Sequence, residues 1–212
     1  MIRLQEELGF KMIFTSSSEI YGDFEGVMTE DVPDRVPIRQ MNDYAISKWV
    51  NEMQIMNSAR DFGTETVRVR LFNTYGPGEH YSKYRSAICV FIYKALHKEP
   101  YTVYLNHRRT SSYIDDTVNT LANILTNFRA GEVYNIAGDE LHDMKTASDI
   151  ILEELDLSDR LVRYEERETA TTKDKIVDNT KSRKELGHKS TVPLKEGIKR
   201  TIQWQKEVYG IE

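Results

Sequence analysis

The sequence predicts an α/β protein in which strands alternate with helices. Residues 11–15 and 66–72 are short apolar runs with the pattern of buried parallel strands, and helical patterns follow them. Each run leads into polar residues: Ser16 to Ser18 follow the first, and Asn73 follows the second. Open α/β sheets bind their ligands at the carboxyl ends of their strands, so these polar residues are candidates for a functional site.

Helices are expected on either side of the first strand. Residues 1–8 have an amphipathic pattern and end at Gly9, where a left-handed C-cap is expected. Residues 22–40 are rich in turn-forming and acidic residues, after which a helical pattern runs to about residue 60. Asn42 or Asp43 can cap that helix.

The long helix that begins near residue 43 has one apolar face. We expect this stripe to be used for packing, with Tyr44 and Lys48 on a different face. The stripe consists of Ile46, Trp49, Val50, Met53 and Met56.

The alternation continues to the carboxyl terminus. The turn that begins at Asn73 leads into a helix of roughly residues 85–96, where Cys89 is expected to be a small buried thiol. Asp115 or Asp116 is expected to cap a later helix, and the charged residues 160–175 are expected on the surface. Further strands are predicted at 101–105, 113–114 and 133–136, and further helices at 115–128, 146–155 and 194–209.

The composition indicates a globular protein and excludes several classes. Of 212 residues, 39% are hydrophobic and 30% are charged, and the net charge of -5 is scattered rather than gathered into a basic stripe for nucleic acid. No apolar run is long enough for a membrane span, and residues 1–10 lack the apolar core of a signal peptide. A single cysteine cannot form an internal disulfide, and no Cys/His cluster has metal-ligand spacing. We expect a cytoplasmic protein without nucleic-acid, membrane or metal partners.

The segment Tyr44-Ala-Ile-Ser-Lys48 carries the first chemical signal. Its phenol and ammonium are four residues apart, so they lie on one helix face within reach of each other. A nearby cation favours the ionised form of a phenol, which can then act as a base. With 12 tyrosines in the chain, such a spacing also arises by chance, and two solvated helix residues are the alternative.

Further motifs follow one another in a fixed order. A serine cluster before Tyr21-Gly precedes Tyr44-x-x-x-Lys48 and then Arg70-Leu-Phe-Asn-Thr-Tyr-Gly-Pro77. Arg109-Thr-Ser-Ser-Tyr-Ile-Asp-Asp116 is similar to R-x-x-x-Y-V-x-D, and Glu132-Val-Tyr-Asn-Ile-Ala-Gly138 to E-x-Y-N-I-G-G. Together these motifs resemble the extended short-chain dehydrogenase/reductase family, the nucleotide-sugar epimerases and dehydratases that use NAD. The likeness covers nearly the whole chain.

The resemblance implies a fold and a division of the chain. The fold is the carboxyl-terminal part of a doubly wound parallel, Rossmann-like sheet with a smaller mixed α/β substrate-binding domain. Residues 1–75 would form the remaining part of the NAD-binding domain, and residues 76–212 mostly the substrate domain, with a segment near 101–128 returning to the sheet. NAD would be the cofactor and a nucleotide-diphosphate sugar the substrate. A homodimer through the helix containing Tyr44 is usual in the family.

The resemblance also implies roles for particular side chains. Ser17 would bind the sugar hydroxyl that is oxidised, Tyr44 would take its proton, and Lys48 would hold the nicotinamide ribose. Plainer alternatives are a strand-end serine that bonds the backbone and an asparagine that only forms a turn. The catalytic set is Ser17, Glu19, Tyr44 and Lys48; the cofactor-binding set is Tyr44, Lys48 and Ser16; the substrate-binding set is Ser18, Asn73, Arg85 and Arg109, the last pairing with the diphosphate.

Glu19 narrows the reaction. A ketone at C4 acidifies the C5 proton, so a carboxylate placed there can abstract it and drive loss of water from C6. Ser17-Ser18-Glu19 resembles the Thr-Ser-Glu of GDP-mannose dehydratases and UDP-glucuronate decarboxylases, whereas thymidine-linked dehydratases have Thr-Asp-Glu. We expect a 4,6-dehydratase, with a UDP-glucuronate decarboxylase or an epimerase as alternatives. Ser18 replaces the proposed acid of the thymidine-linked enzymes, which leaves the proton donor open. Glu19 could instead cap the following turn.

Two parts of the family pattern are missing. The element R-P-G-x-D is replaced from Arg167 onward by Arg-Glu-Thr-Ala-Thr, so base specificity cannot be carried over. The 11 glycines include no G-x-G-x-x-G, which implies that the first strands of the family's sheet are absent and that NAD binding by these residues alone is weak. Residues 11–15 would then form an unpaired edge that invites association. A catalytically silent fragment that only binds a nucleotide sugar or a partner is the second hypothesis.

Overall fold

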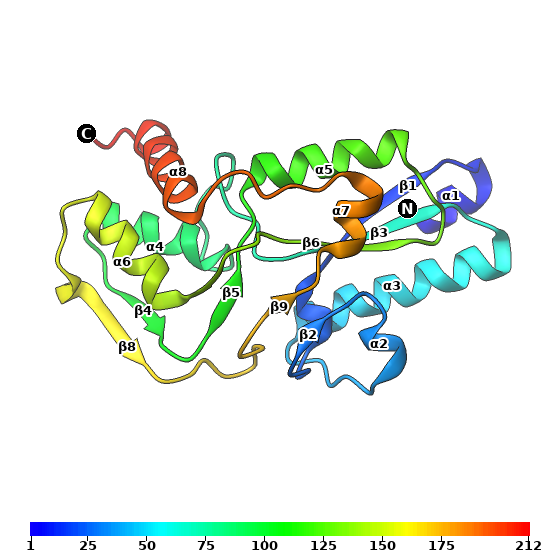
Figure 1. Ribbon diagram of the computed structural model, residues 1–212, viewed down its shortest axis with the longest axis horizontal. Helices are drawn as coiled ribbons and strands as arrows, with labels where there is room; N and C mark the ends of the chain where they lie inside the picture. The colour runs from blue at the N-terminus through cyan, green and yellow to red at the C-terminus, as the bar shows by residue number, and fades with distance from the viewer.

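The computed structural model describes all 212 residues and has the expected α/β class, with two regions side by side (Figure 1). The α-helices are α1 (Ile2–Leu8), α2 (Val32–Arg35), α3 (Asp43–Phe62), α4 (Ala87–Leu96), α5 (Ile114–Thr126), α6 (Met144–Glu154), α7 (Thr180–Leu186) and α8 (Leu194–Tyr209). The strands are β1 (Met12–Ser17), β2 (Val27–Met28), β3 (Thr66–Leu71), β4 (Tyr101–Tyr104), β5 (Arg108–Thr110), β6 (Val133–Ile136), β7 (Leu141–Asp143), β8 (Val162–Glu165) and β9 (Ile176–Val177). Two 3-10 turns complete the chain, η1 (Ser18–Tyr21) and η2 (Asp159–Leu161).

A three-stranded parallel sheet in the order β1-β3-β6 positions the candidate site. Ser17 lies opposite Leu71, and Leu71 lies opposite Ile136, so the carboxyl ends of the three strands meet at one edge. Helix α3 covers one face of this sheet, and α5 and α7 cover the other (Figure 1). Strand β1 pairs only with β3, which confirms the expectation of an edge strand.

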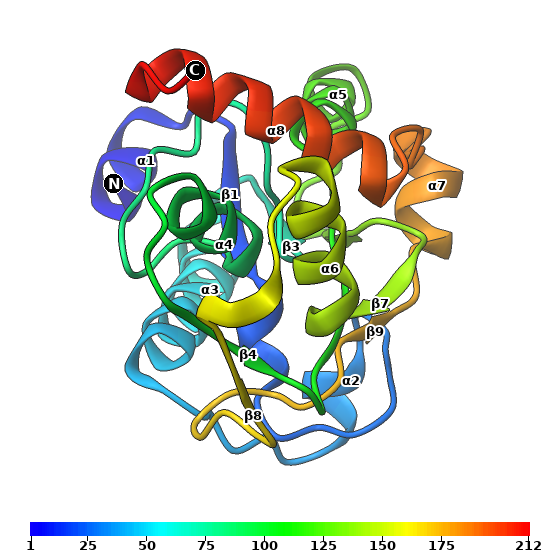
Figure 2. The same ribbon diagram turned by 90° about the vertical axis from the view of Figure 1, so that its left-hand side faces the viewer.

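The second region packs three helices against a pair of strands. Helices α4, α6 and α8 share a core of 14 buried residues, and β4 pairs in parallel with β8 beside them (Figure 2). Within residues 101–128, β4 therefore lies with the second region, whereas α5 packs on the three-stranded sheet through Ile124. None of the helices combines the length and apolar character needed to cross a membrane.

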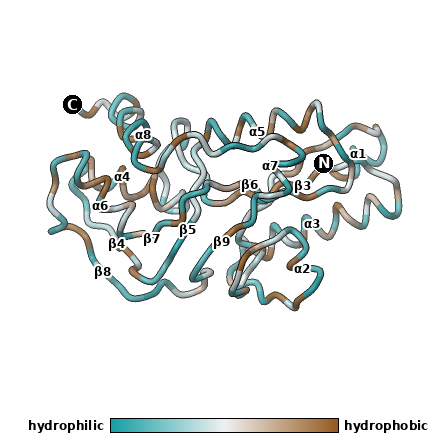
Figure 3. The backbone as a smooth tube through the Cα atoms, in the orientation of Figure 1, coloured by the Kyte–Doolittle hydropathy of each residue, from teal (hydrophilic) through white to brown (hydrophobic).

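The apolar stripe of α3 was expected to be used for packing, and within this chain only Trp49 packs, partly buried against the cluster that contains Ile20 and Tyr21. The exposed fraction lies between 39% and 46% for Ile46, Val50, Met53 and Met56. The trace of α3 in Figure 3 alternates between hydrophilic and hydrophobic residues. The buried side of α3 instead consists of Ala45, Glu52, Ile55 and Ser58. Sequence periodicity identifies two faces of a helix, but it does not say which one meets the sheet.

Two local predictions in the second half are also wrong. Tyr113 and Ile114 do not form a strand, because Tyr113 is the N-cap of α5 and Ile114 is its first residue. Asp116 does not cap that helix. Its carboxylate accepts hydrogen bonds from the backbone N–H groups of Thr191 and Val192 and from the Thr191 hydroxyl, so a contact distant in the sequence determines its role.

The charged segment 160–175 is only partly on the surface. It contains β8, and Thr172 and Lys175 are 4% and 1% exposed.

Other local predictions are confirmed. Asn42 caps α3 by accepting from the Ala45 N–H at 2.8 Å, and Cys89 is buried.

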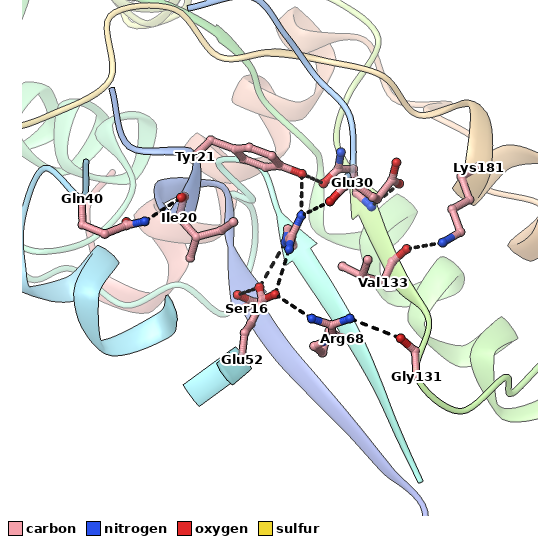
Figure 4. Close-up of polar contacts among 12 residues, drawn as sticks. Ser16, Ile20, Tyr21, Glu30, Gln40, Glu52, Arg68, Gly131, Val133 and Lys181 are labelled. Atoms are coloured by element: carbon pink, nitrogen blue, oxygen red, sulfur yellow. Dashed lines mark hydrogen bonds and ion pairs between the residues drawn. The ribbon is translucent and has the colours of Figure 1, made fainter. Parts of the chain in front are cut away.

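A buried ionic network joins α3 to the sheet (Figure 4). Glu52 is fully buried on α3, and its carboxylate accepts from Arg70 Nη2 at 2.9 Å, from Arg70 Nε at 3.1 Å and from the Ser16 hydroxyl at 2.5 Å. Arg68 donates to the same carboxylate at 3.3 Å. Arg70 Nη1 continues the network to the Tyr21 hydroxyl at 3.0 Å, so β1, β3, α3 and η1 are fixed to one another.

The network keeps Glu52 ionised. Burial opposes the charge on this carboxyl, but the hydrogen bonds and charge of Arg70 outweigh it, so the pKa of Glu52 lies below its ordinary value. A carboxyl whose folded-state pKa is depressed stabilises the fold above its unfolded pKa. This contribution is lost as the pH falls through the folded-state pKa.

We predict that Glu52→Ala lowers the free energy of unfolding by about 3–5 kcal/mol, because it leaves buried arginine charges uncompensated. Urea denaturation near neutral pH measures this change. The matched control is Asp149→Ala, whose exposed ion pair with Lys145 (48% and 49% side-chain exposure) is worth about 0–1 kcal/mol. Equal effects of the two substitutions would contradict the prediction.

Candidate active site

The end of β1 places Ser17 and Glu19 next to each other. Ser17 is the last residue of the strand, and η1 begins at Ser18. The Ser17 Oγ accepts a hydrogen bond from the Glu19 N–H at 3.2 Å, so this serine does cap the turn, as the plainer interpretation suggested. Its hydroxyl proton is not used by this contact and stays available for another acceptor.

Tyr44 and Lys48 face the same strand end from α3. Because Asn42 caps the helix, Tyr44 lies in its first turn, and its side chain is 53% exposed. Lys48 Nζ donates to the Thr15 carbonyl at 2.8 Å and lies 5.7 Å from the centroid of the Tyr44 ring. Partial burial lowers the pKa of Lys48. The ammonium therefore contacts the end of β1 and also lies near the Tyr44 ring.

Glu19 belongs to a cluster of charges that the sequence did not reveal. Its Oε1 forms an ion pair with Lys175, which is 1% exposed. Burial opposes ionisation of Glu19, but Lys175, then Arg109 and then the Asn42 side chain overcome it, so the pKa of Glu19 lies below its ordinary value. Glu168 also faces this cluster, and burial raises its pKa.

The substrate-binding candidates have different environments. Arg109 is 7% exposed, and its Nη1 donates to the carbonyls of Lys173 at 2.7 Å and Arg108 at 2.9 Å. Ser18 is buried on η1. Arg85 is exposed just before α4, and its side chain takes part in none of the contacts that join Glu19, Lys175 and Arg109.

Ser16, a candidate for cofactor binding, has a structural contact instead. Its side chain is 3% exposed and uses its only hydroxyl proton on Glu52. The alternation of side chains along a strand explains this, because Ser16 and Ser17 point to opposite faces of the sheet.

Six buried side-chain atoms have no protein partner, and two of them, Asn179 Oδ1 and Gln205 Oε1, lie directly before α7 and on α8. The other four belong to residues that follow β1 or β3 in the chain: Glu19 Oε2, Gln40 Oε1, Asn73 Nδ2 and Thr74 Oγ1. Gln40 belongs to this group because its other amide atom donates to the Ile20 carbonyl in η1 at 2.9 Å. Buried polar groups in native proteins nearly always have partners, so these atoms point to a ligand rich in donors and acceptors.

Asn73 owes its position to an unusual backbone conformation. Its φ is 43°, a left-handed conformation that asparagine tolerates better than most residues. The turn interpretation of Asn73 is thus correct for the backbone, while its amide Nδ2 remains without a partner.

Lys175, Glu168 and Gln40 were missed by sequence reasoning. Lys175 lies in a strongly charged run, so its burial depends on a partner 156 positions away in the chain. The only local signal was the apolar pair Ile176 and Val177, which forms β9 directly after it. No local pattern marks Gln40.

The residues present fit one side of a dinucleotide. The Tyr44 phenol is exposed, and the Lys48 ammonium donates only one of its three hydrogens to a carbonyl. Both groups can therefore form hydrogen bonds to a ribose hydroxyl at the end of β1. A pyrophosphate needs backbone N–H groups at a Gly-rich helix start, and β1 is followed by η1 rather than by such a helix. The fit therefore covers the nicotinamide ribose and not the pyrophosphate.

Comparison with known proteins identifies the family. Residues 1–137 match the NAD dependent epimerase/dehydratase family. The chain belongs to this family. The resemblance inferred from the motifs is thereby confirmed, and the matched residues contain β1, η1, α3 and β3 with all of the predicted catalytic side chains.

The relatives of this family member carry out more than one reaction. It is 29% identical over 208 residues to UDP-glucuronic acid decarboxylase 1 of Danio rerio, covering 96% of this chain and 49% of the relative. It is 28% identical over 212 residues to dTDP-D-glucose 4,6-dehydratase of Mus musculus, covering 93% and 56%. A putative UDP-glucose 4-epimerase of Methanocaldococcus jannaschii also matches. The chain spans about half the length of the curated relatives it matches.

A solved structure supports the same fold. The dTDP-glucose 4,6-dehydratase from Streptomyces venezuelae, with NAD and TYD bound, aligns with a TM-score of 0.88 at 26% identity. The alignment covers 99% of this chain and 64% of that one. The parallel sheet of this family member is therefore the Rossmann-like sheet expected from its motifs.

Proposed function

We propose that this family member takes part in NAD-dependent modification of a nucleotide-diphosphate sugar through a 4-keto intermediate, and that the reaction is 4,6-dehydration. When bound, NAD supplies the oxidation at C4 that creates the ketone. Tyr44, with Lys48 beside it, would take the proton of the C4 hydroxyl. Ser17 would orient that hydroxyl with its free proton.

The features of Glu19 are the reason for proposing dehydration. It follows Ser17 in the turn at the strand end, it is ionised, and its Oε2 has no partner. A free carboxylate oxygen can remove the C5 proton that the ketone acidifies, after which the C6 hydroxyl leaves. Simple epimerisation at C4 requires no such base.

A decarboxylase is the second candidate because of the cations in the cluster. Lys175 and Arg109 lie close enough to Glu19 to lower its pKa, and the same positive charges favour a sugar that carries a carboxylate at C5. In that reaction the ketone at C4 would assist loss of carbon dioxide rather than of water.

We further propose that a second copy of this chain covers the apolar face of α3. Ile46, Val50 and Met53 are spaced along one side of the helix and are 46%, 40% and 39% exposed. Exposed apolar patches of this kind mark protein interfaces. The open edge of β1 is the competing surface.

The first prediction concerns the products. We expect the chain, incubated with NAD and separate nucleotide sugars, to yield a 4-keto-6-deoxy sugar that is lighter by one water, as detected by mass spectrometry. Tyr44→Phe should lower kcat/KM roughly 100- to 10,000-fold, because it removes the base. Tyr164→Phe, on β8, is the matched control.

Other products would decide between the alternatives. Loss of carbon dioxide from UDP-glucuronate selects the decarboxylase, and a product of unchanged mass selects an epimerase. Tight binding of a nucleotide sugar without turnover, even in excess NAD, would contradict an active enzyme and select the silent fragment.

The second prediction concerns Asn73. Asn73→Gly keeps the left-handed backbone and removes the unpartnered amide, so we expect the free energy of unfolding to change by less than about 1 kcal/mol. The affinity for the nucleotide sugar, measured by calorimetry, should fall about 2- to 10-fold with the lost hydrogen bond. Unchanged affinity would exclude Asn73 from the binding site.

The third prediction concerns assembly. Sedimentation should show association that increases with concentration, and Met53→Lys on α3 should weaken it because a charge cannot be buried there without a partner. Thr15→Lys, on the exposed end of β1, is the matched substitution on the other surface. A larger effect of Thr15→Lys would assign the contact to the sheet edge, and a monomer at all concentrations would contradict both.

A further inference from the structure

The backbone N–H and the backbone carbonyl of Lys175 both form hydrogen bonds that hold this residue in place. Its N–H donates to the Arg108 carbonyl at 3.0 Å, and its carbonyl accepts from the Thr110 hydroxyl at 3.3 Å. Both contacts attach it to β5, directly before β9 begins. The side chain then reaches Glu19 in η1 as a fully buried ion pair partner.

The segment before Lys175 is bound to the same part of the molecule. The Thr172 hydroxyl donates to the Gly22 carbonyl at 2.5 Å, immediately after η1. The Asn42 amide, at the cap of α3, donates to the Ala170 carbonyl at 3.1 Å. Lys175 is therefore placed beside Glu19 by several independent contacts, and a buried lysine charge requires such a partner.

The pair treats the two oxygens of Glu19 differently. Oε1 accepts from Lys175, whereas Oε2 is buried and has no partner in the protein. A buried carboxylate oxygen without a hydrogen bond is costly unless a ligand meets it. The contact with Lys175 thus fixes the direction of the free oxygen.

We propose that Lys175 is a positioning residue for Glu19: it holds one carboxylate oxygen so that the other can remove the C5 proton of the bound sugar. This inference rests on the proposed function. In the step, the C5–H bond breaks, its electron pair stays on the sugar as the enolate of the C4 ketone, and the proton bonds to Glu19 Oε2. Burial lowers the pKa of Lys175, and the charge and hydrogen bond of Glu19 oppose this shift. In the proposed step Lys175 keeps its own proton and acts only through Glu19.

The charges around Glu19 agree with this role. Lys175 and Arg109 are the cations that face it, from the residue before β9 and from β5, and Glu168 is the nearby anion from the segment after β8. Arg109 is engaged with the carbonyls of Arg108 and Lys173. Only Lys175 makes an ion pair with Glu19, so removing it should raise the pKa of the carboxyl.

The direct test is the titration of Glu19 by carbon NMR of labelled carboxyl groups in the whole chain, with the signal assigned by Glu19→Gln. We expect the wild-type pKa to be below the ordinary value of about 4.3. Lys175→Met should raise it by about 1–3 pH units, and Lys175→Arg, which keeps the charge, should leave it low. Lys195→Met, which removes an exposed ion pair on α8, should change nothing.

Two results would overturn the inference. One is a wild-type Glu19 that titrates at or above its ordinary pKa, a measurement that does not require the Lys175 variants to fold. The other is a folded Lys175→Met protein in which Glu19 titrates as in the wild type.

The pH dependence of turnover separates a positioning role from a merely structural one. Glu19 must be ionised to act as a base, so Lys175→Met should move the acid limb of kcat/KM upward by the same amount as the pKa, and Lys175→Arg should restore it. A uniform loss at every pH, with the acid limb unchanged, would overturn the inference. If no nucleotide sugar is turned over, the proposed function fails, whereas the titration still decides whether Lys175 controls Glu19.

Discussion

The buried contact between Glu52 and Arg70 fixes the geometry on which the candidate site depends. Tyr44, Lys48 and Glu52 follow one another at four-residue intervals, so they lie on one side of α3. Glu52 binds Arg70 of β3 and Ser16 of β1, and Lys48 binds the carbonyl of Thr15, the residue before Ser16. This buried ion pair therefore fixes the position of α3 along β1. It thereby also fixes where the Tyr44 phenol and the Lys48 ammonium lie relative to Ser17.

The buried polar clusters around Glu52 and around Glu19 differ in how many of their polar atoms have hydrogen-bond partners. Around Glu52, both carboxylate oxygens have partners, and the network rigidifies the sheet. Around Glu19, one oxygen is engaged and the other is not, and unpartnered atoms of Gln40, Asn73 and Thr74 lie on the adjoining turns and strand ends. Since an unmet buried polar atom destabilises the fold, this incomplete satisfaction is better explained by ligand binding than by stability.

Sequence reasoning was successful where the signal is local. The caps Asn42 and Gly9, the strands of the sheet and the order of the motifs depend on residues close together in the chain, and they were found where predicted. The cap expected at Asp115 or Asp116 was not, because Tyr113 is the N-cap of α5. Sequence reasoning failed where burial is decided by distant partners. The charged run that contains Lys175 has no local signal for burial, because its partner Glu19 is supplied by another part of the fold. The stripe on α3 is the opposite case, since four of its five apolar residues, all except Trp49, are exposed although the pattern usually indicates packing.

The long separation between Glu19 and Lys175 also has a consequence for dynamics. Lys175 reaches the site on a segment that runs from β8, in the second region, to β9, which pairs with β2 next to the sheet. The ionisation state of the Glu19 carboxyl therefore depends on that segment staying in place. A movement that separates the segment from η1 would leave a buried carboxylate with less positive charge near it, and burial would then favour its protonated form. In the proposed reaction the ionised carboxylate is the competent base, so packing of the segment against η1 would be a structural condition for C5 deprotonation.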